Sequence, residues 1–131
     1  FDPVKFSSFE GKTGPYVLYT MVRIKSILNK INKNKEIKIE KIVNEDMENI
    51  LVKIVELSRT LKSYYDEKTL NYITDYLYDL CSLFNKFYSK YSIINEKDEQ
   101  IKNFYIAMIN LIYNTCSKLL DILAIETVEK M

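Results

Sequence analysis

The segment Leu70–Tyr91, which reads LNYITDYLYDLCSLFNKFYSKY, carries the strictest hydrophobic pattern in the chain. Its large apolar side chains recur at alternating steps of three and four residues, and this spacing places them on one face of an α-helix. Such a stripe is typical of the seam between packed helices in a bundle. The stripe consists of Leu70, Ile73, Leu77, Leu80, Phe84, Phe87 and Tyr91. A second line at the flank of this stripe consists of Tyr78, Cys81, Asn85 and Tyr88.

Two helices are predicted before this segment. The first runs from about Pro15 to Ile31, because proline suits the first turn of a helix and the apolar residues behind it form one stripe. The second begins after Asn44, whose side chain can cap a helix and is followed by acidic residues that the helix dipole favours. We expect this second helix to end near residues 64–65, with Asp66 capping the next one.

The last predicted helix starts around residues 96–99 and is apolar almost all round, which indicates a central position. Residues 32–44 form a Lys-rich linker. The alternation over residues 37–42 mimics a strand, but a single strand has no partner. The sequence therefore predicts an all-α fold, a compact antiparallel bundle of four to five helices, with one domain over residues 1–131.

Composition narrows the possible classes of protein. The apolar content of 47% in 131 residues excludes a disordered tail. No apolar run approaches the ~20 residues of a membrane span and no signal peptide opens the chain, so we expect a cytoplasmic protein without membrane contact. There is no histidine, and Cys81 and Cys116 lack CxxC spacing, so we expect core thiols rather than a metal site. A first residue other than Met indicates the C-terminal piece of a longer protein.

Charge is unevenly distributed along the chain. Residues 1–43 hold nine Lys or Arg against four Asp or Glu, whereas residues 44–131 hold ten against fourteen. Such an asymmetry is what a phosphate-facing edge on an otherwise neutral domain would show. A Lys-rich loop from a Lys-rich proteome would look the same, because 17 of the 19 basic residues are lysine.

The string Ser8–Tyr16, SFEGKTGPY, holds both glycines of the chain, and Gly11 and Gly14 permit positive φ in a tight loop before the first helix. This string closely resembles the segment that opens the C-terminal anticodon-binding (DALR-type) domain of bacterial-type arginyl-tRNA synthetases, which are class I enzymes. Three later segments are similar to the same family in the same order. They are Tyr76–Leu80, Phe84–Tyr88, and Leu119–Glu126 with Val128–Met131. The departures are Cys81, Ala124 and Lys130, where Ala, Gly and Arg are usual.

The resemblance implies a module that binds the anticodon stem-loop of tRNA(Arg). It would position this tRNA for ATP-dependent aminoacylation by the catalytic domain of the same parent chain. The signature motifs of that domain do not occur here, so we expect no catalytic residue, no cofactor and no activity in this chain alone. ATP and Mg²⁺ would belong to the parent enzyme, and we expect a monomer.

Two candidate RNA-binding residues follow from the family's pattern. Tyr88 matches a position that the family places against the anticodon loop, and Met131 matches its C-terminal Met, which packs on an anticodon base. Asn85, one turn before Tyr88, is a weaker candidate. A bundle-edge tyrosine and a frayed chain end are the structural alternatives.

The first helix supplies the other candidates on the face that the resemblance turns toward the anticodon arm. Tyr19 and Arg23 lie one turn apart, so a stacked ring and a phosphate-binding guanidinium could act together. Tyr16 is a candidate that could equally pack under the glycine loop. Lys25 and Lys30 would contact phosphates, which position RNA without reading its sequence.

Two other functions remain open at this point. A helical bundle with a purely structural or protein-interaction role would share the helical pattern without binding RNA. The equivalent domain of another class I synthetase, such as the cysteine enzyme, has similar helices, but the Ser8–Tyr16 string argues against it.

Overall fold

The computed structural model describes residues 13–31 and 38–130, with side chains up to residue 126. Five helices occupy most of these residues, and the described part of the chain contains no strand. This confirms the all-α helical bundle. The helices are α2 (Gly14–Lys30), α3 (Glu45–Val55), α4 (Leu57–Glu67), α5 (Asn71–Lys90) and α6 (Glu99–Lys130).

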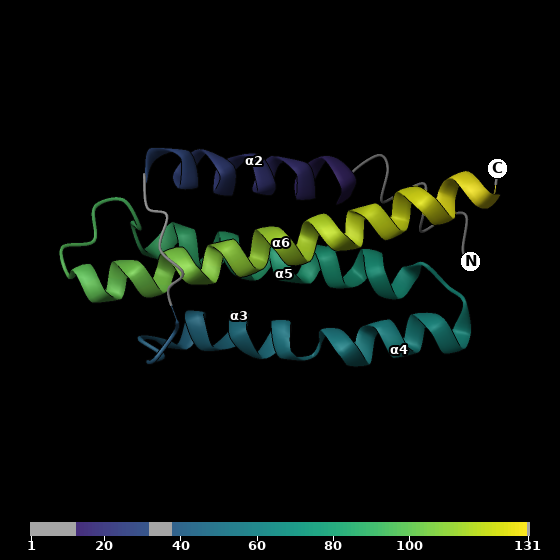
Figure 1. Cartoon of the computed structure of the whole chain (residues 1–131), viewed down its shortest axis with the longest axis horizontal. Coiled ribbons are helices and arrows are strands. Elements are labelled where there is room, and N and C mark those ends of the chain that lie inside the picture. The colour runs from purple at the N-terminus through teal and green to yellow at the C-terminus, as the bar shows by residue number, and fades with distance from the viewer. Residues whose placement is uncertain (1–12, 32–37, 131) are drawn as a thin grey trace.

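Helices α5 and α6 form the middle of the bundle. Figure 1 shows α2 on one side of this pair and the consecutive helices α3 and α4 on the other. α2 packs on both α5 and α6, whereas α4 packs on α5. The molecule therefore has two outer faces, one made by α2 and the other by α3 and α4.

The apolar stripe of α5 lies in the core, as the sequence predicted. Six of its seven side chains are buried, and Tyr91 is partly buried against them. Full burial of a side chain of this size contributes ~1.5–3 kcal/mol to folding. The seam of α5 therefore holds the outer helices on both sides. The six are Leu70, Ile73, Leu77, Leu80, Phe84 and Phe87.

Helix α6 is the long, apolar helix that the sequence placed at the centre, and it packs on α2, α3 and α5. By length and composition alone, Glu99–Glu126 could cross a membrane, because an 18-residue window within it has a mean hydropathy of 1.2. The sequence showed no uninterrupted apolar run of that length because polar residues such as Asn110 and Asn114 interrupt it. A core helix passes the same test, and 44% of the apolar window is buried inside the molecule.

The ends of the helices agree only partly with the sequence patterns. Asn44 caps α3, because its Oδ1 accepts a hydrogen bond from the backbone N–H of Met47 at 2.9 Å. Gly14 does not use its freedom to adopt positive φ; it is the buried first residue of α2. Gly11 lies outside the described residues. The start of α2 at Gly14 agrees with the predicted start at about Pro15.

The predicted second helix is in fact two helices. A turn at Glu56 separates α3 from α4. Asp66 does not cap the next helix; it lies inside α4 and pairs with Lys62 at 3.1 Å. α4 ends instead at Glu67, and its C-cap residue Lys68 adopts the left-handed conformation with φ of 58°. That conformation usually calls for Gly or Asn, so the sequence carried no signal for this helix end.

The two cysteines are buried free thiols, as predicted. A hydrogen bond with Cys81, together with burial, raises the pKa of the Cys116 thiol. The Cys116 thiol therefore stays protonated, and both cysteines act as small core residues.

Candidate functional site

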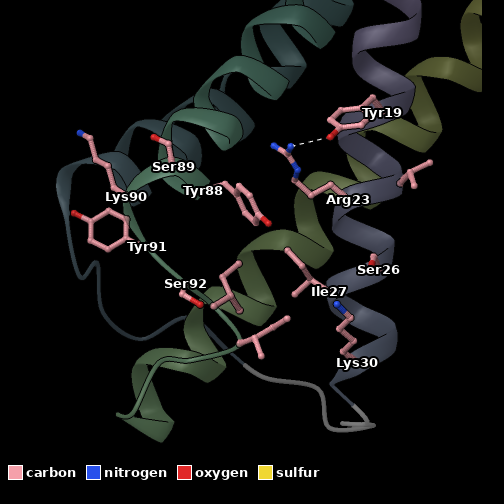
Figure 2. A pocket seen from close by; sticks show the side chains of 13 residues that line it. Tyr19, Arg23, Ser26, Ile27, Lys30, Tyr88, Ser89, Lys90, Tyr91 and Ser92 are labelled. Carbon is pink, nitrogen blue, oxygen red and sulfur yellow. Dashed lines mark hydrogen bonds between the residues drawn. The ribbon is translucent and has the colours of Figure 1, made fainter.

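A groove of about 580 Å³ lies between α2 and the C-terminal end of α5 (Figure 2). The residues that follow α5 close one end of it. Its floor is apolar and is formed in part by the buried side chains of Ile27 and Ile93. Its rim carries aromatic, hydroxyl and cationic groups. From α2 these are Tyr19, Arg23, Ser26 and Lys30, and from α5 and its extension they are Tyr88, Ser89, Lys90, Tyr91 and Ser92.

Arg23 stands at the centre of the rim, against two tyrosines. Its guanidinium carbon lies 4.4 Å from the centroid of the Tyr88 ring and 5.0 Å from that of the Tyr19 ring. Nη2 of Arg23 also donates a hydrogen bond to the Tyr19 hydroxyl at 3.2 Å, as Figure 2 shows. Such cation–π contacts contribute ~0.5–1 kcal/mol at exposed sites. Tyr19, Arg23 and Tyr88 therefore form one group of contacting planar side chains, here called the Tyr–Arg–Tyr cluster.

The Tyr–Arg–Tyr cluster is open to solvent. Tyr19 is 62% exposed and Tyr88 is 41% exposed, although both rings are large and apolar. The bundle core normally buries the apolar surface of aromatic rings, whereas these two rings stay exposed beside a cation. The cluster is thus available to a planar partner.

Asn85 joins the cluster to the interior of the bundle. Its Oδ1 accepts a hydrogen bond from Nη1 of Arg23 at 2.7 Å. Its Nδ2 donates to the Tyr16 hydroxyl at 3.0 Å and to Oγ1 of Thr20 at 2.9 Å. The Tyr16 hydroxyl in turn donates to Oγ of Ser82 at 3.4 Å. This network crosses from α5 to α2 and fixes the two helices side by side at the groove.

The structure brings together most, but not all, of the residues that the sequence singled out. Tyr16 is half-buried between α2 and α5, with its ring 5.4 Å from that of Tyr78. Lys30 lines the groove beside the cluster. Lys25 lines a different, more apolar groove toward α6, with its Nζ 5.5 Å from the Tyr113 ring. Met131 lies outside the described residues.

The groove is positively charged. No Asp or Glu is among the groove-lining residues that the structure describes. Lys90 is paired with the buried carboxylate of Asp46 at 3.0 Å, and this hydrogen bond raises the pKa of the Lys90 amine. The pair offsets the charge of Lys90, so Arg23 and Lys30 supply most of the positive potential. Such a surface attracts anions.

Several contributors to the site carry no signal in the sequence. Thr20 and Ser82 hold the network around Asn85, and Ile93 lines the floor. Thr20 and Asn85 are 65 positions apart, so helical spacing cannot predict their contact. Of the contacts at the site, the one between Tyr19 and Arg23 could be predicted from the sequence, because the two residues lie one turn apart on α2.

The arrangement can bind but offers little for catalysis. The described residues contain no group of three or more His, Cys, Asp or Glu side chains that could hold a metal ion. The groove provides ring faces, a guanidinium plane, an amine and several hydroxyls. These groups suit a ligand that is both planar and anionic, because rings stack on planes and phosphates attract cations.

Comparison with known proteins gives a consistent match. Residues 17–131 match the family model described as DALR anticodon binding domain. The chain is 42% identical over 134 residues to the arginine–tRNA ligase of Alkaliphilus oremlandii and 36% identical over 137 residues to that of Agathobacter rectalis. Each alignment covers 100% of this chain and 23% of the relative. A similar enzyme from Pasteurella multocida is 35% identical, with 24% of its length covered. The chain thus spans about a quarter of the length of these relatives.

Proposed function

Because the chain belongs to the DALR anticodon binding domain family, we propose that it binds the anticodon arm of tRNA(Arg) as the C-terminal module of an arginine–tRNA ligase. The parent enzyme would use ATP and Mg²⁺ to join arginine to this tRNA in the cytoplasm. The module would bind RNA and leave that chemistry to a catalytic domain elsewhere in the parent chain. Docking the anticodon arm would hold the distant acceptor end in the active site of that domain.

The observation that carries this proposal is the exposed Tyr–Arg–Tyr cluster in a groove without acidic residues. Single-stranded RNA loops are recognised when their unstacked bases stack on aromatic rings or on guanidinium planes. The Arg23 guanidinium lies over the Tyr88 ring, with its carbon 4.4 Å from the ring centroid, so these two planes already stack on each other and a base would lie on a side of the cluster that stays open to solvent. An unstacked base could therefore lie against the cluster without a large rearrangement of the protein.

Some N–H donors of Arg23 remain free of hydrogen bonds to the residues that the structure describes and can bind RNA. Arg23 uses Nη1 on Asn85 and Nη2 on Tyr19. A guanidinium carries more N–H donors than these two bonds use, and the remaining ones suit a phosphate or the edge of a base. Lys30 at the end of α2 would add a phosphate contact beside the groove. Lys25 would reach phosphates only on the side of α2 that faces α6.

The tail of the chain is assigned by family resemblance alone. We propose that Met131 packs on an anticodon base, because an unbranched thioether adapts to a flat apolar surface. Tyr16 is held in the α2–α5 network, so we propose that it supports the surface from below. We also propose that the module is monomeric and has no membrane partner.

The proposal is tested by removing one ring from the cluster. Tyr88→Ala should weaken binding of a fluorescently labelled tRNA(Arg) anticodon stem-loop by about 5- to 150-fold, because one base–aromatic stack is worth ~1–3 kcal/mol. Fluorescence anisotropy at a fixed salt concentration measures this affinity.

The matched control is Tyr65→Ala, since Tyr65 is 57% exposed on α4, on the opposite outer face of the bundle. It should bind the stem-loop like the unmodified chain. Equal affinity of the Tyr88→Ala variant and the unmodified chain would contradict the proposed role of the cluster. If the chain bound any RNA hairpin with equal affinity, the binding would be a general electrostatic attraction and not recognition of the anticodon arm.

A further inference from the structure

We infer that Asn85 is a positioning residue, which holds the Arg23 guanidinium in place for RNA without contacting the RNA itself. This inference rests on the proposed function and assigns Asn85 a different role from the direct RNA contact expected from the sequence. It comes from the hydrogen bonds that connect Asn85 to α2. No other side chain links Arg23 to α5 by a hydrogen bond among the described residues.

The amide of Asn85 has its donors fully used inside the protein. A side-chain amide offers one oxygen acceptor and two N–H donors. In Asn85 the two donors go to the Tyr16 hydroxyl at 3.0 Å and to Oγ1 of Thr20 at 2.9 Å. The oxygen faces Nη1 of Arg23 at 2.7 Å. No N–H of this amide remains for a base edge or a phosphate.

The surrounding groups permit only one orientation of the amide. The Thr20 hydroxyl donates its proton to the backbone carbonyl of Tyr16 at 2.9 Å, and the Tyr16 hydroxyl donates to Ser82 at 3.4 Å. With their protons used in this way, both hydroxyls accept from Asn85. If the amide were flipped, its N–H groups would face those of Arg23, donor against donor. The oxygen of Asn85 is thus committed to Arg23.

This commitment determines where the guanidinium lies. Arg23 projects from α2 and reaches across the groove to the Tyr88 ring (Figure 2). Without Asn85, the guanidinium keeps its hydrogen bond to Tyr19 on its own helix and its stacking contact with the Tyr88 ring, but it has no hydrogen bond to the described residues of α5. A long side chain that must be ordered on binding loses affinity, and one that is ordered beforehand does not. Asn85 therefore acts by ordering Arg23 in advance.

A double-mutant cycle separates positioning from direct contact. The variants are Asn85→Ala, Arg23→Ala and the double substitution, each measured for affinity to the tRNA(Arg) anticodon stem-loop. Asn85→Ala should weaken binding roughly threefold or more when Arg23 is present and should change nothing further when Arg23 is already Ala. Equal weakening by Asn85→Ala in both backgrounds would show that Asn85 acts on RNA independently of Arg23, and the inference would be wrong.

A second readout needs no RNA. The Nε–H group of Arg23 in the free protein can be followed by NMR relaxation, and Asn85→Ala should lower its order parameter toward that of a free side chain. Asn85→Asp keeps an oxygen acceptor for Nη1, and the Tyr16 and Thr20 hydroxyls can turn their protons toward it. This variant should keep Arg23 ordered. It also serves if Asn85→Ala fails to fold.

The two readouts separate this inference from the function on which it rests. An unmodified chain that fails to bind the stem-loop would refute the proposed function, while the order of Arg23 would still decide the role of Asn85. Unchanged order of Arg23 in Asn85→Ala, or lost order in Asn85→Asp, would overturn the positioning role. Asn110→Ala, on the exposed side of α6, is the control and should alter neither measurement.

Discussion

At the scale of single residues, Arg23 contacts functional side chains of both α2 and α5. Its guanidinium contacts Tyr19 on its own helix and both Asn85 and Tyr88 on α5. A planar, permanently charged group satisfies all of these contacts together, since it can stack through its faces while donating from its edge. A point charge cannot do both.

This difference predicts the behaviour of a conservative substitution. Arg23→Lys keeps the positive charge but loses the planar face and the fork of N–H donors. We expect affinity for the anticodon stem-loop to fall by about 1 kcal/mol or more, because one stacking plane of the cluster is lost. Isothermal titration calorimetry measures the affinity.

The other arginine of the chain provides the control for this substitution. Arg59 lies exposed on α4, on the opposite outer face, so Arg59→Lys should leave the affinity unchanged. Full affinity in Arg23→Lys would mean that only the charge of Arg23 matters. The planar role of its guanidinium would then be excluded.

Residue-level features were predictable from the sequence where the signal is local. The cap at Asn44 and the one-turn spacing of Tyr19 and Arg23 follow from positions three or four apart. The hydrogen bond between Arg23 and Asn85 joins residues 62 positions apart. It depends on how α2 packs against α5, which a single sequence does not encode in its spacing.

At the scale of helices, a contact from α5 stabilises the break between α3 and α4. The last carbonyls of a helix lack partners within the helix. One of them, on Lys53, accepts a hydrogen bond from the buried Tyr76 hydroxyl of α5 at 2.6 Å. α5 thus stabilises the end of α3. The break was not predictable from the sequence, because the residue at the turn is Glu56 and not Gly, Pro or Asn.

Removing the hydroxyl of Tyr76 tests this contact. Tyr76→Phe should lower the free energy of unfolding by about 1 kcal/mol, because the ring stays buried while the carbonyl of Lys53 loses its partner. Urea denaturation followed by circular dichroism measures the change. Tyr65→Phe, at an exposed tyrosine of α4, should stay within experimental error of the unmodified chain.

The same tyrosine predicts a pH dependence. Burial, with smaller effects of Cys116 and Glu56, raises the pKa of the Tyr76 hydroxyl above its ordinary value. The unfolded chain ionises this group near pH ~10, whereas the folded chain keeps it neutral. Its contribution to stability is therefore complete below that pH and is lost as pH rises further. Tyr76→Phe should lose stability less steeply above pH ~10; identical slopes would contradict this.

At the scale of the whole molecule, the two outer faces of the bundle differ in charge. α2 carries three basic residues and no acidic one, and it forms the groove with α5. α3 and α4 carry acidic as well as basic residues and cover the far side (Figure 1). The charge asymmetry between residues 1–43 and 44–131 was visible in the sequence, as were the helical class and the family. The groove itself was not predictable, because it depends on the packing of α2 beside the residues after α5.

The charge of this face predicts a salt dependence. Each phosphate contact releases counterions, so the logarithm of the affinity should fall linearly with the logarithm of the salt concentration. Lys30→Ala should reduce the steepness of that line by about 1, the amount expected for one lost contact. Lys62→Ala, on α4, should leave the slope unchanged. An unchanged slope in Lys30→Ala would show that Lys30 does not contact an RNA phosphate.

The most direct test of the account is to map the RNA-binding face residue by residue. Backbone amide shifts of the isotopically labelled chain can be followed by NMR during titration with the tRNA(Arg) anticodon stem-loop at physiological salt. We predict shifts concentrated on residues 16–30 and 78–94, absent from α4, and weaker with a loop of substituted bases. Shifts centred on α3 and α4, or shifts identical for any RNA and lost with salt, would contradict a specific anticodon-binding face at the Tyr–Arg–Tyr cluster.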